Sequence, residues 1–277
     1  MSKKENKIRI NSMQKAYLND ILVRRVAGYK SLANRILKDV PENDNDIKTI
    51  GNDSLVDTLK TKIDDQVKLF YTIFDNKKLK NSVSKLIGVK FKKKSQTDYK
   101  KFINSNKDVK KYFQKLEVSQ GLKLDDLIDN ENLKEYLDVA IDANVELIKT
   151  MDKDTFSSIS KAVYQNIASG NSKDKLSDTL LKIGTSSEKK ARSIAMDQTN
   201  KILENMNKQR SISLGATKFE WQTTGKKLIS QGGSSRDEHN SFDGKIYTYK
   251  DGAGSRGILP GEDVNCQCTA LPIFDEE

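Results

Sequence analysis

The chain is poor in residues that cross-link or kink a polypeptide. Its 277 residues include only two cysteines and three prolines. Cys266 and Cys268 are separated by one residue and form a poor structural staple, because disulfide geometry is demanding. A reducing, intracellular site of synthesis is therefore expected.

Long apolar runs are also missing. No run of about 18 apolar residues occurs, so no membrane-spanning helix is expected. The charged segment Met1–Lys7 is not followed by an apolar signal core, which argues against export by that route.

The chain is rich in positive charge, and its composition favours helices. The 49 lysines and arginines exceed the 39 acidic residues and give a formal charge of +10. Such an excess favours non-specific contact with polyanions, meaning nucleic acid or a membrane surface. With 35% hydrophobic and 32% charged residues, the chain is expected to be a helix-rich soluble protein rather than a disordered one.

Residues 1–150 carry helical periodicity. Apolar residues recur at three- and four-residue spacing over about 11–39, 53–80 and 122–151, which predicts three long helices. Val40-Pro41 ends the first of these patterns. We therefore expect a helical, basic amino-terminal region that contacts partners.

A lysine-rich stretch with interleaved aromatic residues lies between Lys90 and Lys115. Charge runs of this kind are usually solvated helix faces, but they also make sequence-independent contacts with phosphates. No motif for reading base edges is recognisable. The candidate nucleic-acid contacts are Lys90, Lys92, Lys93, Lys94, Lys100 and Lys101.

The remainder, 151–277, is predicted to change from helices to strands. Helices are expected over about 153–168, 175–183 and 185–213, and Thr185 with Glu188 forms a capping box at the start of the last. Alternating residues around Phe219 and Trp221 predict a strand, and 246–249 and 269–274 predict two more. The expected fold class is α+β and mainly α: long amino-terminal helices, then a carboxy-terminal lobe of helices and a small β-sheet.

The single histidine, His239, shares one short segment with the only cysteines, Cys266 and Cys268. These residue types supply the nitrogen and sulfur ligands of tetrahedral zinc, with Asp237 or Asp243 as a fourth ligand. The spacing is unusual, because most structural zinc sites use Cys-x-x-Cys. The other interpretation is that the cysteines are small buried hydrophobes and that His239 hydrogen-bonds a loop carbonyl. Both stay open.

A series of short motifs surrounds these residues and resembles a known family. The series is Arg236-x-x-His239, Asp243-Gly244, Pro260-Gly261 and Asn265-Cys266-x-Cys268. From about Thr155 onward the chain resembles the phage Mu protein F-like family, which includes minor head proteins similar to the one in phage SPP1. The resemblance covers roughly the last 125 residues and assigns 151–277 to a domain of that family. Asp243-Gly244 is expected to form a turn between two extended pieces.

The resemblance implies a minor capsid or head-morphogenesis protein of a tailed phage. Such a protein is assembled in the host cytoplasm and resides inside the virion head. The implied partners are the portal, capsid and scaffold proteins, with packaged DNA as a neighbour that the protein accompanies or protects during ejection. No catalytic turnover is implied.

The chain departs from the family pattern at two places. Where the family often has Ile-Ala-Arg-Thr, this chain has Ile194-Ala195-Met196-Asp197, and Gly232–Ser235 replaces an acidic and basic pair.

The rival function is that of an enzyme: a metal-dependent nuclease or a phage-delivered effector. It is weakened because residues 1–150 contain no histidine, no cysteine and no spaced acidic cluster.

Overall fold

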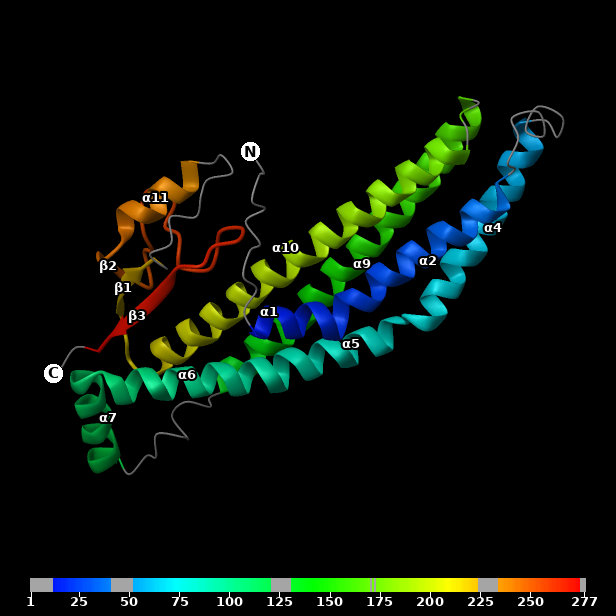
Figure 1. The fold of residues 1–277 in the computed structure, drawn as a ribbon. Helices are drawn as coiled ribbons and strands as arrows, with labels where there is room; N and C mark the ends of the chain where they lie inside the picture. Colours follow the sequence, from blue (N-terminus) through cyan, green and yellow to red (C-terminus); the bar gives the residue numbers. More distant parts are fainter. Residues whose placement is uncertain are drawn as a thin grey trace. The chain divides into compact units, whose positions relative to one another are not determined.

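The computed structural model describes residues 12–40, 52–120, 131–169, 171, 173–223 and 234–274 (Figure 1). The structure confirms the expected mainly-α α+β class, with a three-stranded antiparallel sheet near the carboxy terminus. The helical elements are α1 (Ser12–Tyr17), the π-helix η1 (Leu18–Leu22), α2 (Val23–Asp39), α4 (Asn52–Ile73), α5 (Asn76–Ser84), the π-helix η2 (Lys85–Phe91), α6 (Lys92–Ser105), α7 (Lys107–Gln120), α9 (Glu131–Ala168), α10 (Lys173–Ser213) and α11 (Ser234–Phe242). The strands are β1 (Lys218–Gln222), β2 (Ile246–Thr248) and β3 (Thr269–Ile273). Among the helices described, none combines the length and apolarity needed to cross a membrane.

The chain forms two compact units that interleave along the sequence. The bundle unit comprises the described parts of Met1–Ser84 and Asp142–Ala195, and the sheet unit those of Lys85–Ile141 and Met196–Glu277. The helices α9 and α10 each run through both units. The division at residue 150 follows the family resemblance and does not coincide with these units.

The bundle unit packs α2 beside α4 (Figure 1). Close approach is possible because Gly28 has no side chain: a Cβ there would lie 2.8 Å from Cε2 of Phe70. The interior also contains charge. The guanidinium of Arg25 on α2 forms an ion pair with the carboxylate of Asp152 on α9, and the Tyr29 hydroxyl donates to the same carboxylate. Burial raises the pKa of Asp152, and the charge of Arg25 opposes that rise.

Several predicted helix boundaries are wrong, because tertiary packing overrides local signals. The predicted helices over 175–183 and 185–213 are one helix, α10, and Thr185 is no N-cap: its hydroxyl donates to the Leu181 carbonyl at 3.0 Å. The predicted break before residue 153 is likewise absent from α9. Conversely, the helix expected over 53–80 is broken at Asp75, whose carboxylate accepts from the Lys78 amide at 2.7 Å and caps α5.

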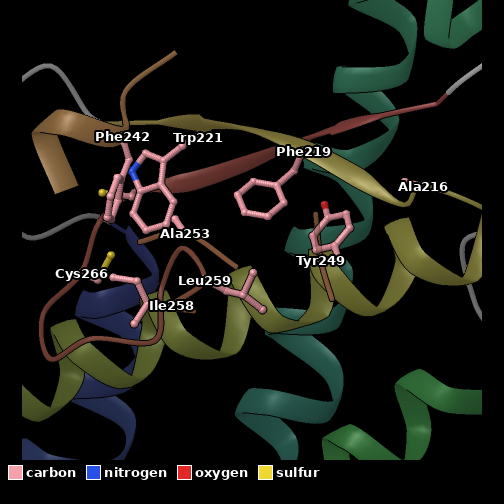
Figure 2. Close-up of a cluster of buried hydrophobic side chains, with 10 residues drawn as sticks. Ala216, Phe219, Trp221, Phe242, Tyr249, Ala253, Ile258, Leu259 and Cys266 are labelled. Atoms are coloured by element: carbon pink, nitrogen blue, oxygen red, sulfur yellow. The ribbon is translucent and has the colours of Figure 1, made fainter. Parts of the chain in front are cut away.

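The sheet unit carries the three strands in the order β2-β1-β3, which confirms all three predicted strands. The central strand β1 buries Phe219 and Trp221 on one face, in the alternation that a half-buried strand requires. Figure 2 shows these two rings on the same side of β1, facing an apolar cluster. The buried residues of that cluster are Ala216, Phe219, Trp221, Phe242, Tyr249, Ala253, Ile258, Leu259, Cys266 and Cys268.

Part of the lysine-rich stretch belongs to the same unit as the sheet. Buried residues of α6 and α7, including Tyr99, Ile103 and Phe113, form an apolar cluster with Leu214 and the partly buried Phe274. The Tyr112 hydroxyl donates to the Leu214 carbonyl at 3.0 Å. Arg210, which is fully buried on α10, donates to the Ser95 hydroxyl on α6. The lysine-bearing helices are therefore packed against the carboxy-terminal half of α10.

Breaking the buried Arg25–Asp152 pair should destabilise the bundle unit more than breaking an exposed ion pair of the same unit. Arg25→Met leaves the Asp152 carboxylate buried without its cation and should lower the free energy of unfolding by about 3–5 kcal/mol in a urea titration. Lys190→Met breaks the exposed Lys190–Asp154 pair, which spans 2.8 Å, and should cost less than about 1 kcal/mol. Equal losses from both variants would contradict the importance assigned to the buried pair.

Candidate functional site

The imidazole of His239 lies against both cysteine sulfurs. Its Nδ1 is 3.7 Å from Sγ of Cys266 and 3.7 Å from Sγ of Cys268. The three ligand atoms lie within 4.8 Å of one another, and the three residues are 7%, 6% and 8% exposed. The structure thus brings together the three residues that the sequence singled out.

Three separate segments position this group, here named the His–Cys cluster (His239, Cys266 and Cys268). His239 comes from α11, whereas the cysteines come from the loop that leads into β3. Trp221 of β1 packs edge-on against the imidazole with ring centroids 5.2 Å apart. Figure 2 shows Cys266 at the same end of the apolar cluster as Trp221 and Phe242.

A chain of polar contacts holds the far side of the imidazole. Nε2 of His239 lies 3.0 Å from Oδ2 of Asp263. Arg256 donates to both carboxylate oxygens of Asp263, at 3.2 and 3.0 Å, and to Glu238 at 2.8 Å. The guanidinium of Arg256 lowers the pKa of Asp263, so this carboxylate stays ionised beside the histidine. The Nε2 hydrogen bond therefore orients the ring and turns Nδ1 toward the sulfurs.

The two sulfurs differ in their electrostatic surroundings. A hydrogen bond from Cys268 lowers the pKa of Cys266 to about 4, against burial and with help from His239 and the Gly261 amide. The Gly261 amide donates to Sγ of Cys266 at 3.3 Å. The same hydrogen bond raises the pKa of Cys268, because Cys268 is the donor. Hydrogen bonding to Cys266 also raises the pKa of His239, so the cluster favours one thiolate beside the imidazole.

Asn265 shapes the loop that presents Cys266. It has φ 57°, the left-handed region that asparagine tolerates better than most residues. The backbone amide of Asn265 donates to the Asp197 carboxylate at 2.7 Å, and the Gln267 side chain contacts the Met196 sulfur at 3.7 Å. Met196 and Asp197 are two residues at which this chain departs from the family pattern, and they hold the cysteine loop against α10.

The turn motif Asp243-Gly244 has a structural position outside the cluster. Oδ1 of Asp243 accepts from the Thr223 amide and hydroxyl at 2.7 and 2.9 Å, which lowers the pKa of Asp243. Gly244 has φ 71° and donates its amide to the Trp221 carbonyl at 2.8 Å. The sequence predicted an extended segment on each side of this turn. The segment before the turn is instead the helix α11, so that half of the prediction is wrong.

Asp243, one of the two residues considered as a fourth zinc ligand, lies apart from the His–Cys cluster. Its carboxylate is held by Thr223, and it is not a member of the group of converging ligands. The side chains of Arg236 and Asp237 lie outside the part of the chain that the structure describes, although their backbone belongs to α11.

Four of the six candidate DNA contacts share one face of α6. Lys93 with Lys100, and Lys94 with Lys101, are seven residues apart and share a face that is opposite the buried Tyr99 and Ile103. Lys90, Lys93 and Lys101 are exposed, and Lys92, Lys94 and Lys100 are partly exposed. Lys94 also forms an ion pair with Asp98.

Sequence reasoning missed the residues that surround the cluster. Asp263, Arg256 and Glu238 have no distinctive spacing, and only the fold brings them to the histidine. Glu204 on α10 was missed for the same reason. It accepts from Thr269 Oγ1 at 3.2 Å and from the Ala270 amide at 3.4 Å, and burial raises its pKa to about 8.

Gly261 provides a test of the loop that carries Cys266. It has φ 86°, and a Cβ there would lie 2.7 Å from Cβ of Glu204. Gly261→Ala should therefore lower the free energy of unfolding by about 1–3 kcal/mol in chemical denaturation. The matched control is Gly88→Ala on η2, where a Cβ meets nothing within 4 Å, and it should be neutral or slightly stabilising. An unchanged Gly261→Ala protein would contradict the packing described.

Comparison with known protein families finds a match for the carboxy-terminal part of the chain. Residues 157–271 match the profile of the family described as "Phage Mu protein F like protein". A protein of Haemophilus influenzae named "Uncharacterized protein" is 27% identical over 166 residues, which is 57% of this chain and 36% of that protein. The chain thus spans little more than a third of the length of this relative, and no solved structure matches. The resemblance drawn from the sequence is confirmed over residues 157–271, which match the model of this family.

Proposed function

We propose that this protein is a structural component of a tailed-phage head, a minor capsid or head-morphogenesis protein. The match of residues 157–271 to the phage Mu protein F-like family carries this proposal. In it, the protein joins the procapsid in few copies through the portal and remains in the mature virion beside packaged DNA.

The way the family segment is built into the fold supports an interaction role for the rest of the chain. Residues 157–195 pack in the bundle unit with helices α1, α2, α4 and α5, and residues 196–271 pack in the sheet unit with α6 and α7. Each half of the family segment therefore completes its core with helices from outside it. The amino-terminal helices provide surface for the portal and for other head proteins.

Weak, sequence-independent contact with DNA is the second part of the proposal. On α6, Lys93 and Lys101 are exposed and Lys94 and Lys100 are partly exposed, and the whole chain has a formal charge of +10. Lysine side chains on such a face neutralise phosphates and release counterions without reading bases. Packaged DNA at high local concentration makes even weak binding of this kind effective.

The head assignment is tested on particles. Mass spectrometry of purified virions and of procapsids from the phage that encodes this chain should find the protein in both, at a small fraction of the major capsid protein. Deleting its gene should reduce particle assembly or infectivity. Absence of the protein from both kinds of particle would contradict the proposal.

DNA contact is tested by electrophoretic mobility shift at low salt. Glu substitutions at Lys93, Lys94, Lys100 and Lys101 should weaken binding and reduce the slope of log affinity against log salt by up to about 4.

The control for that experiment carries the same change in net charge at another place. Glu substitutions at Lys153, Lys161, Lys182 and Lys189, all exposed on α9 and α10, should leave the slope nearly unchanged. Equal weakening by both quadruple variants would assign binding to net charge alone. No shift of DNA by the parent protein at low salt would contradict DNA contact outright.

The rival function is an enzyme, either a metal-dependent nuclease or a phage-delivered effector. The same protein incubated with plasmid DNA and Mg²⁺, Mn²⁺ or Zn²⁺ should leave the plasmid intact. Cleavage that disappears in His239→Ala, with the fold retained, would favour the rival.

A further inference from the structure

We propose that His239, Cys266 and Cys268 bind one zinc ion, which cross-links α11 to the loop before β3. The proposal concerns the stability of the sheet unit. It holds or fails independently of the role in the phage head.

The distances within the His–Cys cluster suit a tetrahedral ion. Zinc takes Zn–S bonds of about 2.3 Å and Zn–N bonds of about 2.0–2.1 Å, which places neighbouring ligand atoms roughly 3.5–3.8 Å apart. Nδ1 of His239 lies 3.7 Å from each sulfur, and all three ligand atoms fall within 4.8 Å. An ion fits between them with little movement of the side chains.

The contacts around the cluster match those of zinc ligands. A metal-binding histidine usually donates its second ring N–H to a carboxylate, and His239 has Asp263 at 3.0 Å in that place. Arg256 fixes Asp263 in turn. Sγ of Cys266 accepts the Gly261 amide at 3.3 Å, as metal-bound thiolates accept backbone amides.

Chemistry and burial favour zinc over other ions. Two sulfurs and one imidazole suit zinc, whereas magnesium and calcium require oxygen ligands. The three residues are almost fully buried, and the adjacent Trp221 is fully buried. Asp243 is held by Thr223 and is not among the ligands in the proposal.

Hydrogen bonding alone is the competing explanation of the cluster. In that case, an imidazole and two reduced cysteines satisfy one another in a metal-free lobe. The two explanations differ in metal content, in the reactivity of the thiols and in the response to a chelator, so each of these can be measured on the full-length chain.

Metal content and ligand identity are measured first. Untagged protein purified under reducing conditions should contain about one zinc per chain by elemental analysis. Replacing zinc with Co²⁺ should give an intense visible spectrum of tetrahedral cobalt together with a sulfur-to-cobalt charge-transfer band. The cobalt spectrum is recorded on the parent protein, so it does not depend on whether any variant folds.

Variants then assign the ligands. The double variant Cys266→Ser, Cys268→Ser and the single variant His239→Ala should lose the zinc. Asp243→Asn is the matched control: it changes an acidic residue four positions after His239 that lies outside the cluster, and it should keep the full metal content.

Chelation tests the structural role. A strong chelator should lower the Tm of the parent protein by roughly 5–10 °C, and added zinc should restore it. The chelator should also raise the reaction rate of both thiols with an alkylating reagent. Three results would overturn the proposal: no zinc and no cobalt charge-transfer band in the parent, full zinc content in the double cysteine variant, or a Tm that the chelator leaves unchanged.

Discussion

The carboxy-terminal lobe depends on one imidazole that contacts both cysteines. His239 lies on α11, and Cys266 and Cys268 lie near the start of β3, so their contact joins segments that are 27 and 29 residues apart. Trp221 from β1 covers the same imidazole. The lobe has a sheet of only three short strands. A group that ties the helix, the loop and the central strand together is therefore a main source of its order.

The bundle unit uses a different constraint. Its long helices bury apolar stripes, and within that interior Arg25, Tyr29 and Asp152 satisfy one another. A buried pair of this kind is weak support for stability in itself, but it penalises packings that separate its members. We infer that it fixes the register of α2 against α9. The two units thus obtain specificity by separate means, one through paired charges and the other through the His–Cys cluster.

The sequence predicted those features whose signals are local. The three strands were found because apolar and polar residues alternate around Phe219 and Trp221. The His–Cys cluster was found because the only histidine and the only two cysteines of the chain lie in one segment. Features set by distant contacts were not found. The capping box at Thr185 is a valid local signal, yet α10 continues through it, because packing outweighs a penalty of about 1 kcal/mol for the helical Gly184. Asp263 and Arg256 approach the histidine only through the fold.

The most direct test of the central claim is X-ray absorption at the zinc K-edge on the purified full-length protein. A zinc cross-link at the cluster predicts a first shell with two sulfur atoms at about 2.3 Å and imidazole nitrogen at about 2.0–2.1 Å. A first shell of oxygen and nitrogen without sulfur would place the metal at the surface. It would leave the lobe to be held by hydrogen bonds and apolar packing alone.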